Sequence, residues 1–109
     1  VDAVDVFEDF INLSQDIANK YNLPNIKFEK RNIINDWEII NNYNVVVFTF
    51  GIDNSIEIKK YLREYSRCFI FEKKLNFPMK SGLIIKKSDE ENFTETFVTQ
   101  AYTPDIIKC

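Results

Sequence analysis

Apolar side chains recur at intervals of three, four and seven residues near the start of the chain. The residues of this series are Phe7, Phe10, Ile11, Ile17, Ala18 and Tyr21. Acidic and amide side chains stand between them, which is the pattern of a helix with one apolar face. The series stops before Leu23 and Pro24, so the pattern predicts a helix over residues 4–22.

After Asn25 the pattern changes to the alternation of extended chain. IKFEK (26–30) alternates apolar and polar positions, and NVVVFTFG (44–51) is apolar on both faces, as in a central strand. Residues 32–41, between these two segments, fit the pattern of a helix as well as that of a strand. Periodicity does not distinguish a helix from a strand in so short an apolar run. We favour a strand there.

A second helix and three closing strands complete the prediction. Cap residues follow Gly51, and Ile58, Tyr61 and Leu62 have helical spacing, which predicts a helix over residues 54–66. Extended patterns then return at residues 68–77, 82–87 and 93–102. This order predicts an α+β fold, with two helices on one face of an antiparallel sheet of about five to six strands. We expect residues 1–109 to form one compact domain.

The composition argues against most catalytic chemistry. The chain has no histidine, which removes the commonest general base and the commonest metal ligand. Two cysteines are too few for a structural zinc site, and neither glycine belongs to a phosphate-binding motif. We therefore expect no enzymatic activity, no cofactor and no metal. Cys68 and Cys109 are a poor disulfide framework, so a reducing compartment, the cytoplasm, is favoured.

Charge is separated along the chain although its net value is only -3. Residues 51–87 hold nine basic and four acidic side chains, whereas residues 1–25 and 88–109 each hold five acidic residues and one lysine. Separated charge accelerates encounter with a partner of opposite charge. A small acidic α+β domain of this kind is similar in type to the bacterial immunity proteins, which neutralise nuclease toxins. The hypothesis is a non-enzymatic inhibitor of a basic protein, monomeric or weakly dimeric.

The partner-binding surface of this hypothesis is an acidic patch around the turn SDEEN at residues 88–92. Exposed acids there stabilise the fold little and are available for recognition, and one aromatic ring supplies an apolar anchor. The predicted partner-binding residues are Asp89, Glu90, Glu91, Phe93 and Glu95, joined by Asp5, Glu8 and Asp9 of the first helix.

Two other functions stay open at this point. The first is a dimeric secretion-type chaperone that binds an extended client. The second is a nucleic-acid-binding domain that uses the basic segment 57–87, with lysine pairs such as Lys59 and Lys60 beside aromatic residues. The acidic pI near 5 disfavours nucleic acid as a partner. No apolar stretch approaches the length that spans a membrane, so no membrane partner is expected.

Overall fold

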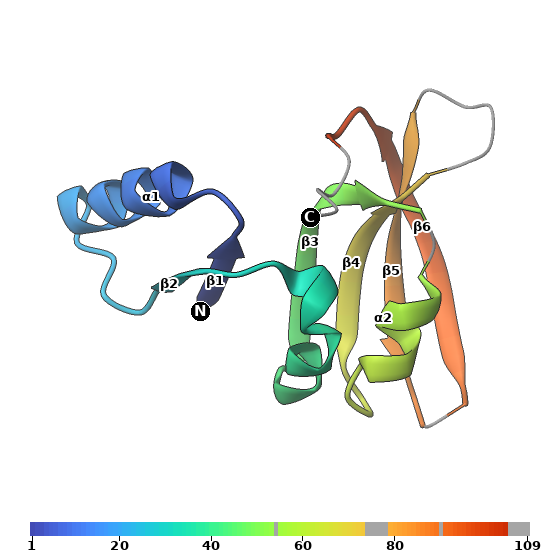
Figure 1. The fold of residues 1–109 in the computed structure, drawn as a ribbon. Helices are drawn as coiled ribbons and strands as arrows, with labels where there is room; N and C mark the ends of the chain where they lie inside the picture. The colour runs from blue at the N-terminus through green and yellow to red at the C-terminus, as the bar shows by residue number, and fades with distance from the viewer. Residues whose placement is uncertain (54, 74–78, 90, 105–109) are drawn as a thin grey trace. The chain divides into compact units, whose positions relative to one another are not determined.

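The structure is a computed structural model that describes residues 1–53, 55–73, 79–89 and 91–104 (Figure 1). Contacts between residues divide the chain into two units, Val1–Asp36 and a second one that begins at Trp37. Each unit is described separately below. The one-domain organisation stays a prediction.

The first unit is built around two parallel strands. β1 (Asp2–Asp5) is followed by α1 (Glu8–Lys20), which leads to β2 (Lys27–Lys30). The two strands pair in parallel, with Asp2 opposite Lys27 and Asp5 opposite Lys30. A short 3-10 helix, η1 (Ile33–Asn35), ends the unit. This is a strand–helix–strand crossover, the connection that parallel strands require.

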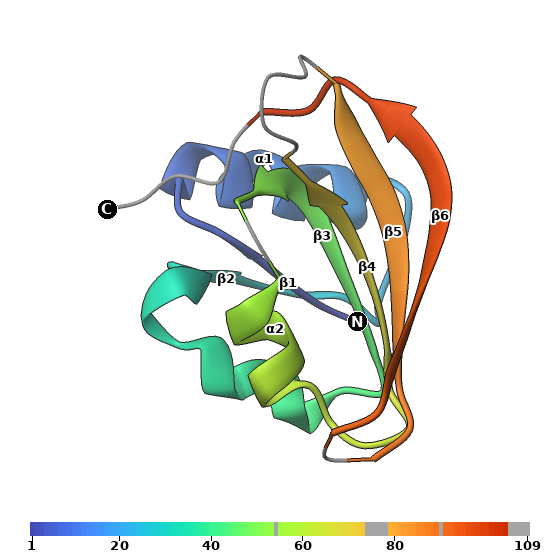
Figure 2. The same cartoon turned by 90° about the vertical axis from the view of Figure 1, so that its right-hand side faces the viewer.

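The second unit is a four-stranded sheet with helical segments on one face (Figures 1 and 2). It contains the 3-10 helix η2 (Trp37–Asn42), β3 (Val45–Ile52), α2 (Ile56–Tyr61), β4 (Arg67–Glu72), β5 (Lys80–Lys87) and β6 (Phe93–Ala101). The strand order is β3-β4-β5-β6. β3 and β4 are parallel, because α2 carries the chain back between them, and the other two pairs are antiparallel.

Apolar side chains form the core of the second unit. Ile58 and Leu62, at α2, are each 1% exposed, and Ile70 and Ile85, on the two central strands, are fully buried. Phe48 on β3 is 5% exposed and lies against Trp37 of η2, with 5.8 Å between the ring centroids. Burial of such side chains contributes about 1.5–3 kcal/mol each.

The β5–β6 pair contains a bulge. Gly82 lies opposite Thr99 and Leu83 lies opposite Phe97, so Val98 is an extra residue on β6. An extra residue of this kind bends its strand and increases the local twist. β6 is also an edge strand of its sheet, and all but its first and last residues are exposed.

The predicted α+β class is confirmed, and the described residues contain six strands, within the range expected. They belong to two sheets, however, and two of the strand pairs are parallel. The prediction of a purely antiparallel sheet was wrong for these pairs, because each is joined through a helix and not by a hairpin. β3 is an edge strand and not the central strand that its two-sided apolar pattern predicted.

Three predicted elements have different boundaries or types. Residues 32–41 are 3-10 helices and not a strand, because Asn32 Oδ1 accepts a hydrogen bond from Ile34 N and starts a helical turn. The first helix begins at Glu8 and not at residue 4, since Val4 and Asp5 belong to β1. The second helix ends at Tyr61 and not at residue 66.

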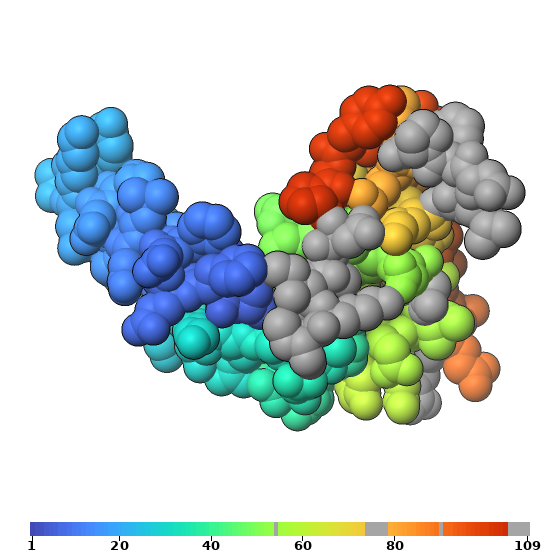
Figure 3. Space-filling view, turned by 45° about the horizontal axis from the view of Figure 1, so that its top comes forward, coloured from blue at the N-terminus to red at the C-terminus, as the bar shows by residue number. Residues whose placement is uncertain are grey.

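Residues of α1, blue in Figure 3, form part of the surface of the first unit. Phe10, Leu13 and Ile17 are each about half exposed, at 53%, 56% and 46%. Of the apolar series that predicted this helix, Ala18 is the buried member. No helix within the described residues is both long enough and apolar enough to cross a membrane.

Candidate functional site

The candidate site lies in the first unit, where both parallel strands end. In sheets with parallel strands, ligands bind outside the carboxyl ends of the strands. β1 ends at Asp5 and β2 ends at Lys30, and Arg31 N donates to Asp5 O at 2.8 Å just beyond the last strand pair. The backbone segments that follow the two strands therefore lie side by side at one edge.

Asp5 stands at the junction between β1 and α1. Its Oδ1 accepts a hydrogen bond from Phe7 N at 3.0 Å, which turns the chain out of the strand and into the helix. A carboxylate has about four acceptor positions, so this bond leaves capacity for a ligand. Glu8 and Asp9 follow in the first turn of α1, where acids interact favourably with the helix dipole.

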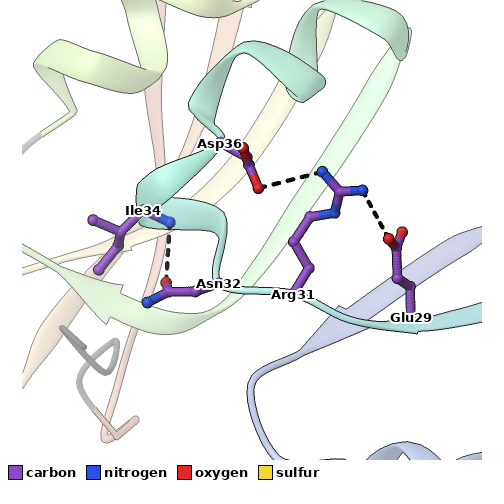
Figure 4. A network of polar contacts seen from close by, with 5 residues as sticks. All are labelled: Glu29, Arg31, Asn32, Ile34 and Asp36. Carbon is purple, nitrogen blue, oxygen red and sulfur yellow. Dashed lines mark hydrogen bonds and ion pairs between the residues drawn. The ribbon is translucent and has the colours of Figure 1, made fainter.

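Arg31 joins two carboxylates at the end of β2 (Figure 4). Its Nη2 lies 2.7 Å from Glu29 Oε1, and its Nη1 lies 3.3 Å from Asp36 Oδ2. The hydrogen bond to Glu29 and the charge of Glu29 raise the pKa of Arg31, with a smaller effect of Asp36. The guanidinium is therefore held in place at the strand end by residues before and after it.

Asn32 is the next residue and carries a buried donor. Its Oδ1 accepts from Ile34 N at 3.2 Å, whereas its Nδ2 is buried without a partner in the described part of the chain (Figure 4). Arg31 Nε is also buried without a hydrogen-bond partner among the described residues. A buried donor without an acceptor is costly, and such groups call for an explanation such as a ligand. Asn32 Nδ2 is thus an unused hydrogen-bond donor close to the end of β2.

The acidic turn that sequence analysis proposed as a partner surface belongs to the second unit. Asp89 organises the turn, since its Oδ1 accepts from Glu91 N and Asn92 N and its Oδ2 accepts from Asn92 Nδ2. Its pKa is lowered, first by the bond from Asn92 Nδ2 and then by the backbone bond from Glu91. Asp89 therefore has a structural task in the turn. Glu91 is exposed, and Glu90 lies outside the described residues.

The other predicted residues of β6 have partners within the second unit. Glu95 forms an ion pair with Lys59 of α2. Phe93 is half-buried, and Lys87 Nζ lies 5.4 Å from the centroid of its ring. Asp5, Glu8 and Asp9 are in the first unit, so the described members of the predicted patch are divided between two units. Binding of a basic protein by these residues stays a prediction.

Cys68 is not a candidate nucleophile. It is 1% exposed on β4, and burial raises the pKa of its thiol to about 12. The thiolate, which is the reactive form, is therefore absent at neutral pH.

The fold of the chain is similar to that of solved methyltransferases. A putative protein-L-isoaspartate O-methyltransferase from Plasmodium falciparum, in complex with S-adenosyl-L-homocysteine, matches 100% of this chain with a TM-score of 0.80 and 12% identity. A second protein-L-isoaspartate O-methyltransferase matches 96% of this chain with a TM-score of 0.77 and 14% identity. The likeness is one of fold. No family model and no curated protein sequence matches the chain.

The chain spans only part of these two proteins, 53% of the first and 33% of the second. Both are named as enzymes, so the fold contradicts the prediction of a non-enzymatic, immunity-protein-like inhibitor and the expectation of no enzymatic activity. The chaperone and nucleic-acid alternatives are not supported by this likeness either. Neither the lack of histidine nor the lack of a glycine-rich motif excludes a fold that enzymes also have.

No sequence pattern indicated Arg31 or Asn32, and Asp5 was predicted as a partner-binding residue, a role that stays a prediction. One signal was available for Asp5: the β-branched residues Val4 and Val6 flank it directly before the helical series. A short strand before a helix indicates a strand–helix crossover, with an acid at its carboxyl end. For Asn32 no sequence signal existed, because its buried donor depends on the folded structure.

Proposed function

We propose that the chain is part of an S-adenosylmethionine-dependent methyltransferase and that the carboxyl ends of β1 and β2 bind the nucleoside part of the methyl donor. The observation that carries this proposal is the position of Asp5, at the end of a parallel strand and at the start of the crossover helix, in a chain with this fold. The complex of the Plasmodium protein with S-adenosyl-L-homocysteine identifies the ligand class to test. When bound, the donor supplies a methyl group activated by a sulfonium.

Asp5 suits the ribose of such a ligand. In dinucleotide-binding folds an acid near the end of a parallel strand accepts hydrogen bonds from ribose hydroxyls. The Asp5 carboxylate retains acceptor positions beyond the one used by Phe7 N. Bonds from hydroxyls to an ionised carboxylate are about twice as strong as those between neutral groups.

Asn32 suits the base of the same ligand. Its Nδ2 is a buried donor without a partner among the described residues, and the edge of an adenine ring offers nitrogen acceptors. Arg31, fixed by Glu29 and Asp36, holds the start of this segment in position. Asp5 and Asn32 then contact two different parts of one nucleoside.

The absence of histidine is compatible with this reaction. Isoaspartate, the residue named for both similar proteins, carries a carboxyl group. A carboxylate has an ordinary pKa of about 4 and is already ionised at neutral pH, so no general base is needed to prepare it as the methyl acceptor. The residues of this chain have to bind and orient the reactants and exclude water.

The test is binding of S-adenosyl-L-homocysteine to the chain, measured by isothermal titration calorimetry. Asp5→Asn keeps an oxygen that accepts from Phe7 N but removes the charge, so the local fold is preserved. We expect this substitution to weaken binding at least about 10-fold, because hydrogen bonds to charged groups contribute about 1.5–3 kcal/mol. Asp9→Asn, which removes the same charge from the exposed first turn of α1, is the matched control and should leave the affinity unchanged.

Asn32→Ala should also weaken binding of S-adenosyl-L-homocysteine. It should affect binding of ribose alone less, because Asn32 is proposed to contact the base. No heat of binding at millimolar ligand, or equal effects of Asp5→Asn and Asp9→Asn, would contradict the proposal. Because the chain spans only part of the similar proteins, the experiment measures binding and not turnover.

We also propose that the protein works in the cytoplasm. Cys68 is a free, buried thiol, which is the state that a reducing compartment maintains. Mass spectrometry of the protein purified from its native cells, alkylated under denaturing conditions, should show Cys68 unoxidised.

A further inference from the structure

A polar hollow with three cationic side chains lies in the second unit, at the end of the sheet where β3 and β4 begin. Its volume is about 690 Å³, within the range of about 300–1,000 Å³ of small-molecule sites. Lys60, Arg63 and Lys87 line it together with one acid, Glu64. The remaining lining includes Asn41, Asn44 and Tyr65. This hollow is at the opposite end of β3 and β4 from their carboxyl ends.

The cations come from three different parts of the fold. Lys60 is on α2, Arg63 is on the α2–β4 loop, and Lys87 is the last residue of β5. Lys87 is 6% exposed, and its Nζ donates to Leu62 O at 2.7 Å and to Lys59 O at 3.3 Å. It is therefore fixed at the floor of the hollow, whereas Lys60 and Arg63 are exposed and able to reach a ligand.

The α2–β4 loop is held in an unusual conformation at the rim. Tyr65 has a φ of 63°, in the left-handed region that residues with a β-carbon seldom adopt, and its side chain is 82% exposed. Backbone bonds from Tyr65 N to Lys87 O at 2.7 Å and from Ser66 N to Arg63 O at 3.1 Å fix this shape. A strained residue with an exposed ring is a feature found at ligand sites. Glycine or asparagine would fit the backbone with less strain, so the packing of the fold does not explain the tyrosine.

We infer that this hollow binds a small multivalent oxyanion, a phosphate ester or a polycarboxylate. Three cations against one acid give the lining an excess of positive charge, and Asn44 adds an amide group that can donate hydrogen bonds. The amide of Asn41 already donates to Tyr61 O at 3.3 Å. Arg63 matches phosphate and carboxylate groups with paired donors. The ring of Tyr65 at the rim offers a flat apolar surface for the rest of the ligand.

The surrounding charges favour a small anion over a polymer. The β5–β6 turn, with Asp89 and Glu91, lies at the same end of the sheet as the α2–β4 loop (Figures 1 and 2). A nucleic acid or an acidic protein that extended beyond the hollow would meet these carboxylates, and the whole chain has a net charge of -3. A compact anion meets only the lining of the hollow, where three cations outnumber the one acid, Glu64.

The experiment is titration of the ¹⁵N-labelled chain with inorganic pyrophosphate and, separately, with citrate at low ionic strength. Saturable shifts of the amides of Arg63, Glu64, Tyr65 and Lys87 with either probe support the inference, and the stronger probe identifies the source as phosphate or carboxylate. Arg63→Ala and Lys60→Ala should each lower the affinity for the tighter-binding probe at least about 5-fold. Lys86→Ala, which removes the same charge from an exposed position on β5, is the control and should change affinity less than about 2-fold.

A further variant separates the site from a merely structural loop. Asparagine adopts the left-handed conformation more readily than tyrosine, so Tyr65→Asn should keep or raise the melting temperature. The same substitution should lower the affinity for the tighter-binding probe. The inference is overturned if neither probe shifts these amides, or if Lys86→Ala weakens binding as much as Arg63→Ala. These readouts come from the second unit and do not depend on S-adenosyl-L-homocysteine binding in the first.

Discussion

Phe48 shows how much one side chain contributes to the second unit. It is 5% exposed and its ring contacts Trp37. We expect Phe48→Ala to lower the free energy of unfolding by about 3–5 kcal/mol, through lost burial and the cavity left behind. Urea denaturation followed by tryptophan fluorescence measures this directly, because Trp37 is the reporter next to the substituted ring.

The control for Phe48 is its neighbour on the same strand. Val47 is 61% exposed, so Val47→Ala should cost less than about 1 kcal/mol. A loss below about 1 kcal/mol for Phe48→Ala would show that the ring is not part of the core.

Single residues divide into those that pattern predicted and those that only the folded chain explains. The burial of Phe48, Ile58 and Cys68 follows from the apolar runs around them. The role of Asp5 was not predictable from composition, since an acid before a helix is also an ordinary stabiliser of that helix. Its position becomes informative only when β1 is known to be a parallel strand.

The β5–β6 turn depends on the ionised form of Asp89, which leads to a pH dependence. Because its folded pKa is lowered below the ordinary 3.8, the ionised carboxylate stabilises the fold above about pH 3.8. This stability is lost as pH falls through the folded pKa. Asp89→Ala should therefore lower the melting temperature at pH 6, and its difference from the wild type should shrink below pH 3.8.

Glu91→Ala serves as the comparison for Asp89, because it removes the same charge from the same turn without removing the bonds to Glu91 N and Asn92 N. Its melting temperature should follow that of the wild type across the pH range. An equal pH response of the two variants would mean that net charge, and not the hydrogen bonds of Asp89, sets the effect.

Whole elements were predictable where local pattern decides them, and not where distant pairing does. The two α-helices, β4, β5 and β6 follow from periodicity, although their predicted ends differ from the observed ones by up to five residues. The parallel pairing of β1 with β2 and of β3 with β4 joins segments separated by a helix, which no local pattern records. Residues 33–35 and 37–42 form 3-10 helices where a strand is predicted. The few apolar residues there fit the periodicity of a helix and that of a strand equally well.

The molecule as a whole should not depend on a bound metal for its stability. Within the described residues, no three side chains of the types that ligate metals gather in one place. We expect 5 mM EDTA to leave the melting temperature of the purified chain unchanged, because the sequence predicts no metal site whose occupation would stabilise the fold. Calorimetry against the same concentration of calcium-loaded EDTA measures this, and a drop of several degrees with free EDTA alone would reveal a metal site.

Function at the level of the whole chain was the least predictable property. Charge separation is visible in the sequence, but it affects the rate of encounter with charged partners. It does not indicate which chemistry a site performs. The candidate site combines the ends of two strands that are more than twenty residues apart, Asp5 and Arg31. A ligand site of this kind exists only after the strands pair, so the sequence showed its residues without showing that they are neighbours.

The extra residue Val98 also affects how the protein behaves at high concentration. β6 presents a long open edge of nine residues, and open edges are where separate copies of a protein pair into aggregates. The bulge interrupts that edge between Phe97 and Thr99, so a foreign strand finds no unbroken register along it. We therefore expect deletion of Val98 to preserve β5–β6 pairing and to lower the solubility of the protein, because the edge would then be regular.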